Sequence, residues 1–122
     1  MKIALTALGL ALTVGILFQG LASGADVAKG KATYDQLCTG CHGPTGKGDG
    51  PAAASLNPKP RDLSDKTYAR SLKDEFLFEI TKNGGPAVKK SPLMPAMGKT
   101  LKDDQIKDLV AYLRALSKTP AR

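Results

Sequence analysis

The residues best suited to chemistry are Cys38, Cys41 and His42, which lie within one stretch of five residues. Two thiols three positions apart lie one helical turn from each other, so both can form thioether bonds with vinyl groups of a single porphyrin. The imidazole that follows is then placed to bind the porphyrin iron. A Cys-x-x-Cys-His run after a signal-like N-terminus is typical of covalent haem attachment. We therefore expect one haem c, joined to Cys38 and Cys41 and ligated by His42.

Other uses of the two thiols are less consistent with the sequence. A disulfide between Cys38 and Cys41 needs an unusually tight loop, and a redox pair of the thioredoxin type needs a preceding βαβ pattern, which is not visible here. A zinc site needs four ligands, usually from two pairs of Cys or His residues, and this chain offers two cysteines and one histidine close together.

The first 25 residues have the order of a secretory signal. Lys2 precedes an uncharged run from Ile3 to Leu21, and small residues follow it up to Ala25. We expect cleavage after Ala25 and a mature domain over residues 26–122 in the periplasm. The uncharged run is also close to the ~20 residues that span a bilayer, so a retained membrane anchor stays open as the alternative.

The composition points to a small basic domain whose centre is filled by a cofactor. The chain has a formal net charge of +7, no Trp, three Phe and three Tyr, so aromatic side chains are too few to fill the core. The basic balance favours acidic protein partners or anionic lipid. Nucleic acid is a poor candidate because the lysines are scattered and no basic, aromatic-rich stretch appears.

Apolar periodicity and capping residues predict an all-α domain. The helices are expected over residues 26–37, over a stretch that Ser71 would cap and that ends near Asn83, and over residues 102–117. Gly30 lies inside the first of these and weakens it, which makes sense if another helix crosses closely there. Residues 52–70 are expected to be irregular but ordered, because Asn and Pro residues interrupt them.

With these features in place, the stretch from Asp26 to Lys118 resembles the class I c-type cytochromes. The matching residues are Gly30 and Tyr34 before the Cys-x-x-Cys-His run, the Gly50-Pro51 pair, the Met94-Pro95 pair, and the closing helix with Tyr112. The resemblance implies the small cytochrome c fold, with three to four helices around a covalently bound haem. It also implies that Gly30 and Tyr34 meet the last helix near Leu109 and Tyr112.

The remaining site residues follow largely from this resemblance. It implies that the carbonyl of Pro51 accepts a hydrogen bond from the haem-binding histidine, and it places the sixth iron ligand at Met94. From the residues alone, His42 is the only histidine, so methionine, lysine, water or an open position remain, and Met97 is the other methionine of the mature domain. Arg61 is a candidate for contact with a haem propionate.

A haem iron held by histidine and methionine has no place for a substrate, so the expected function is single-electron transfer between redox proteins, without catalysis by the chain itself. The alternatives are a haem sensor or peroxidase-like protein with an open sixth site, and a haem subunit of a larger dehydrogenase or oxidase. Acidic docking surfaces are expected on the partners, because basic residues flank the loops predicted to rim the haem: Lys47, Lys59, Lys89, Lys90 and Lys99.

Overall fold

The computed structural model describes residues 24–122, and within this range the regular elements are all helical. The elements are α1 (Val27–Leu37), α2 (Thr39–His42), the 3-10 helix η1 (Ala53–Ser55), α3 (Lys66–Ser71), α4 (Asp74–Asn83), the 3-10 helix η2 (Gly85–Val88) and α5 (Asp103–Ser117). The all-α prediction is confirmed. The signal or anchor predicted for residues 1–25 lies, apart from its last two residues, outside the described part of the chain.

No helix between residues 24 and 122 combines the length and the apolar character needed to cross a membrane.

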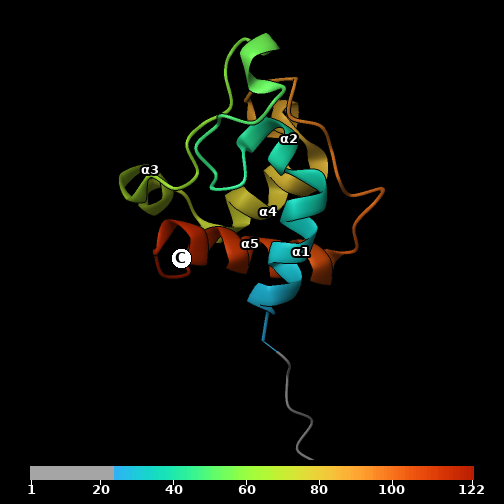
Figure 1. The fold of residues 1–122 in the computed structure, drawn as a ribbon. Helices are drawn as coiled ribbons and strands as arrows, with labels where there is room; N and C mark the ends of the chain where they lie inside the picture. Colours follow the sequence, from blue (N-terminus) through green and yellow to red (C-terminus); the bar gives the residue numbers. More distant parts are fainter. Residues whose placement is uncertain (1–23) are drawn as a thin grey trace, which may run out of the picture.

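Two crossing helices from the two ends of the domain, α1 and α5, form the frame of the fold (Figure 1). They touch at backbone level, since a Cβ added at Gly30 would overlap the carbonyl group of Asp108. Beside this crossing the rings of Tyr34 and Tyr112 lie 5.2 Å apart at an interplanar angle of 56°, and Leu109 completes the buried cluster. The predicted contact of the first helix with the last one is confirmed.

The start of α1 is set by Asp26, as the sequence predicts. Its side chain accepts hydrogen bonds from the backbone N–H groups of Ala28 and Lys29, at 2.9 and 3.1 Å. Its own N–H donates to Oδ1 of Asp108 on α5 at 2.6 Å. Asp26 therefore caps the start of α1 and also binds α1 to α5, the helix that it crosses.

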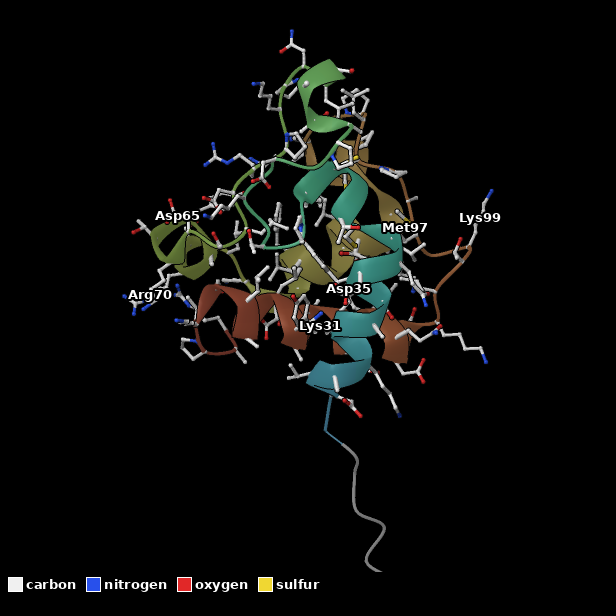
Figure 2. The ribbon with its side chains drawn as sticks, viewed as in Figure 1. Lys31, Asp35, Asp65, Arg70, Met97 and Lys99 are labelled. Carbon is white, nitrogen blue, oxygen red and sulfur yellow. The ribbon has the colours of Figure 1, made fainter. Side chains whose placement is uncertain are left out.

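The middle of the chain differs from the prediction. Ser71 does not cap α4 but ends α3, and α4 begins at Asp74 after Lys73. The reason is a stronger start signal upstream: the side chain of Asp65 accepts hydrogen bonds from the N–H groups of Thr67 and Tyr68, at 2.7 and 3.1 Å. The extra helix α3, with Asp65 and Arg70 at its two ends in Figure 2, lies inside the stretch expected to be irregular.

The loop between η2 and α5 runs alongside the C-terminal end of α4 (Figure 1). Two backbone hydrogen bonds hold it there, from the N–H of Met97 to the carbonyl of Thr81 at 2.8 Å and from the N–H of Gly98 to the carbonyl of Lys82 at 2.9 Å. The loop predicted from its prolines is therefore attached to the end of α4 at Met97 and Gly98.

Candidate functional site

A cavity of about 370 Å³ lies between α2, α4, the loop that follows η2, and residues 56–72, which we call the mid-chain segment. Its volume falls in the range of roughly 300–1,000 Å³ that is usual for cofactor pockets. Apolar side chains make up most of the lining, and the sequence-predicted residues Cys41, His42, Arg61 and Met94 are part of it. The other lining residues are Leu56, Pro58, Lys59, Pro60, Leu63, Tyr68, Leu72, Phe76, Leu77, Ile80, Thr81, Lys90, Ser91, Leu93, Pro95 and Leu113.

The cysteine-histidine run is positioned by the end of α1. Cys38 is the C-cap of α1. Its carbonyl accepts a hydrogen bond from the N–H of His42 at 2.9 Å, and this bond closes the single turn of α2. Cys41 lines the cavity, and Cys38 packs against the Tyr34, Leu109 and Tyr112 cluster. Burial, with the nearby thiol of Cys41, raises the pKa of Cys38 to about 11, so this thiol is uncharged at neutral pH.

Both cysteines are free thiols, with no disulfide between them. Over residues 24–122, no three side chains of His, Cys, Asp or Glu gather in a way that would hold a metal ion by themselves.

His42 is half-buried at the cavity wall, and its burial lowers the pKa of the imidazole. A neutral imidazole keeps a nitrogen lone pair free for a metal. The Nδ1 atom is buried and has no hydrogen-bond partner among residues 24–122. The hydrogen bond from His42 to the carbonyl of Pro51 stays a prediction. Pro51 is exposed and does not line the cavity.

Met94 lines the cavity and Met97 does not. The backbone holds Met94 in place, since its carbonyl accepts the N–H of Gly85 at 2.9 Å. The chain turns tightly before this contact at Gly84, which has a φ of 82° and a backbone close to that of Met94. Residues 42 and 94, far apart in the sequence, thus contribute an imidazole and a thioether to one cavity.

Three basic residues, Lys59, Arg61 and Lys90, are part of the lining, which contains no Asp or Glu. The Arg61 guanidinium lies 4.3 Å from the centre of the Tyr68 ring, a cation–π contact that holds the charge at the cavity. The positive charge of these three side chains suits an anionic group, such as a carboxylate, at the opening of the cavity. Sequence reasoning missed Tyr68, because it belongs to residues 52–70, the segment for which no regular structure was predicted.

Comparison with known proteins identifies one family. The family model described as "Cytochrome c" matches residues 27–117. The CcoP subunit of the cbb3-type cytochrome c oxidase of Azospirillum sp. (strain B510) is 35% identical over 95 residues, which cover 78% of this chain and 30% of that protein. The CcoP subunit of Rubrivivax gelatinosus is 37% identical over 90 residues, covering 74% of this chain and 26% of the relative. The chain thus spans less than a third of either curated relative.

A solved structure with a comparable size is also similar. The KustC0563 c-type cytochrome superposes with a TM-score of 0.57 at 25% sequence identity, and the match covers 71% of this chain and 95% of that one. The fold therefore matches that small protein almost in full, and the sequence matches part of the two longer CcoP subunits.

Proposed function

The chain belongs to the cytochrome c family, and from this membership we propose that it carries one covalently bound haem c and passes single electrons between redox proteins. The family implies a covalently bound haem and electron transfer. The single observation that supports a complete site in this chain is that Cys41, His42 and Met94 all line one cavity. The neutral imidazole and the apolar lining fit such a group.

Within this proposal, Cys38 and Cys41 would form the thioether bonds, and His42 and Met94 would supply the two protein ligands of the iron. The bound iron supplies the redox change between the ferric and ferrous states. The loop attached to α4 holds Met94 in place. Because the protein fixes both ligands, little rearrangement accompanies the gain or loss of an electron. A saturated iron leaves no place for a substrate, so we expect no catalysis by the chain itself.

The assignment of Met94 is tested by replacing the two methionines separately. Met94→Ala should abolish the methionine-to-iron charge-transfer band of the oxidised protein and allow carbon monoxide to bind readily after reduction. Met97→Ala is the matched control, because Met97 lies outside the cavity lining, and it should keep the band. Ready binding of carbon monoxide to the unsubstituted protein would instead favour the sensor or peroxidase-like alternative.

The partners are proposed to be redox proteins with acidic docking surfaces in the periplasm. The cations at the cavity, Lys59, Arg61 and Lys90, support this charge complementarity. The similarity to CcoP subunits keeps a second role in view, as a haem subunit of a larger oxidase or dehydrogenase. Purification of the native protein at low salt separates the two, since a subunit remains in a stoichiometric complex and a shuttle elutes alone.

Charge steering has its own test. The rate of electron transfer to an acidic redox partner should fall about tenfold as the ionic strength rises from 0.01 to 0.15 M, because salt screens the attraction. Lys90→Glu at the cavity should lower the low-salt rate more than Lys107→Glu on the exposed surface of α5. A rate that does not change with salt, or equal effects of the two variants, would reject steering by this face.

Intact mass of the purified native protein tests the proposal as a whole. The expected mass contains one haem that survives denaturation, and it lacks residues 1–25 if the predicted signal is removed. A colourless protein from a host able to attach haem would contradict the proposed function.

A further inference from the structure

The backbone nitrogen of Asp26 lies at the crossing of the first and last helices. Its N–H donates to Oδ1 of Asp108 on α5 at 2.6 Å, and the Asp108 side chain is half-buried there. One turn further along α1, a Cβ added at Gly30 would overlap the carbonyl of the same Asp108. A carboxylate therefore holds the nitrogen of residue 26 where the two helices touch at backbone level.

Negative charge around this nitrogen exceeds the positive charge. The Asp26 carboxylate caps α1, and the Asp108 carboxylate faces the nitrogen itself. Among residues 24–122, Asp108 belongs to no ion pair, and Asp26 has only the Nζ atom of Lys29, at 4.0 Å. A cation at the position of the nitrogen would complement Asp108, because a partly buried carboxylate is stabilised by a charged donor.

Removal of the predicted signal creates such a cation. The sequence predicts a cut after Ala25, and the structure shows Gly24 and Ala25 exposed and outside any helix, since α1 begins at Val27. Hydrolysis of the Ala25–Asp26 peptide bond by a signal peptidase consumes one water molecule. It leaves a carboxylate on Ala25 and an α-amino group on Asp26, which is mostly protonated at neutral pH.

We propose that the Ala25–Asp26 bond is the processing site of this chain, and that the ammonium group freed on Asp26 forms an ion pair with Asp108. The unprocessed chain presents a neutral N–H to this carboxylate, whereas the processed chain presents a charged donor at the same place. The positive end of the α1 dipole opposes the new charge, but the carboxylate of Asp26 itself offsets that effect. Processing thus binds α1 more firmly to α5.

The ion pair acts on the frame of the fold and not on the cavity. Asp26 caps the start of α1, whereas Cys38 caps its other end and α2, which follows, carries His42. Figure 1 shows α1 running from the start of the described chain toward α2. We therefore expect processing to change the stability of the domain and to leave its absorption spectrum unchanged. The inference is independent of the proposed function, because it involves no haem ligand.

The ion pair is tested with two forms of the exported holoprotein, one that begins at Asp26 and one that keeps Gly24 and Ala25. In the longer form the ammonium group lies two residues away, on exposed backbone. Asp108→Asn keeps an oxygen that accepts a neutral N–H but removes the charge that attracts an ammonium group. It should raise the unfolding equilibrium constant about tenfold in the form that begins at Asp26, and about threefold or less in the longer form.

Unfolding is measured in urea, because guanidinium is a salt and would screen the pair. Asp104→Asn is the matched control, since Asp104 is exposed in the first turn of the same helix, one turn before Asp108. It should change the two forms equally. Equal effects of Asp108→Asn on the two forms would overturn the ion pair.

Intact mass of the native protein tests the processing site. The expected chain begins at Asp26. A chain that keeps Ala25, that keeps all of residues 1–25, or that lacks Asp26 would overturn the proposal. Covalent haem adds its own mass, so a correctly processed protein without haem contradicts the proposed function and leaves this inference standing.

Discussion

Arg114 on α5 is a buried cation that ties the junction between α3 and α4 to the C-terminal helix. It is 5% exposed. Its Nε donates to Oδ1 of Asp74 at 2.7 Å, and its two terminal nitrogens donate to the carbonyls of Ala69 at 2.6 Å and Leu72 at 2.7 Å. Leu72 lines the cavity, so this one side chain connects the frame of the fold with a wall of the site.

Replacing Arg114 by methionine keeps a straight apolar stem but removes all three hydrogen bonds. Breaking a buried charge pair by deleting one partner costs about 3–5 kcal/mol. The side chain of Asp74 is 31% exposed and can be hydrated, which favours the lower end of that range. We expect Arg114→Met to lower the free energy of unfolding by about 3 kcal/mol, a fall in Tm of about 12–24 °C for a domain of this size.

The measurement is guanidinium unfolding of the holoprotein, followed by far-ultraviolet circular dichroism. Arg70→Met is the matched control, because Arg70 is exposed on the neighbouring α3, and it should change the stability by no more than about 0.5 kcal/mol. Arg114→Lys should fall between wild type and Arg114→Met, since an ammonium group cannot reproduce the planar fork. A loss below about 1 kcal/mol in Arg114→Met would refute the role given to these contacts.

Two further predictions concern the crossing of α1 and α5. Burial raises the pKa of the Tyr34 phenol above its ordinary value, so the unfolded state loses this proton first and stability should fall by about 1.4 kcal/mol per pH unit above about pH 10. The stabilisation from the protonated Tyr34 phenol is fully present below that pH. In unfolding measured as a function of pH, Tyr34→Phe should remove the dependence, and the control Tyr68→Phe should retain it. Gly30→Ala should destabilise the protein by about 1–3 kcal/mol, because its Cβ overlaps the Asp108 carbonyl. Gly40→Ala, whose Cβ meets nothing within 4 Å, should stay within about 0.5 kcal/mol in the same unfolding assay.

The helices at the two ends of the domain could be predicted because their signals are local. Asp26 begins α1 with its own side chain, and the apolar stripe of α5 repeats along the helix. The crossing itself was predictable from Gly30, since a glycine that weakens a helix is explained by a neighbour that needs its space. The signals for both helices need only residues within a few turns of each other, and Gly30 marks the place of the crossing without identifying the partner helix.

The position of the mid-chain segment, residues 56–72, which forms one wall of the cavity, could not be predicted in the same way. Pro58 and Pro60 correctly indicated an irregular backbone, but they gave no sign of where it lies. Its position depends on contacts distant in the sequence, such as the hydrogen bond from the N–H of Leu63 to the carbonyl of Gly46 at 2.6 Å. The bonds of Arg114 to residues 69, 72 and 74 are of the same kind, and nothing in the sequence around Arg114 distinguishes it from a solvated surface arginine.

The residues of the candidate site also divide into those that a local pattern predicts and those that come from a distant segment. Cys41, His42 and Met94 reach the cavity as the sequence predicts, because a short motif and a Met-Pro pair identify them. The resemblance placed the acceptor of the histidine proton at Pro51, which is exposed and does not line the cavity. A later segment, which includes Pro60 and Arg61, does line the cavity together with His42. Gly48 lets this later backbone approach the loop that follows His42, because a Cβ at Gly48 would overlap the Pro60 carbonyl.

The two sides of the cavity are therefore held by different forces. Cys41 and His42 extend from α1, which is fixed against α5 by buried aromatic rings and backbone contact. The opposite wall is fixed by a few polar contacts, those of Arg114 above all, and such regions open at lower free energy than a helical frame. Substitutions in the frame, and at Arg114, which joins the frame to this wall, should thus change global stability first. Substitutions confined to the wall should change the surroundings of His42 while the frame stays folded.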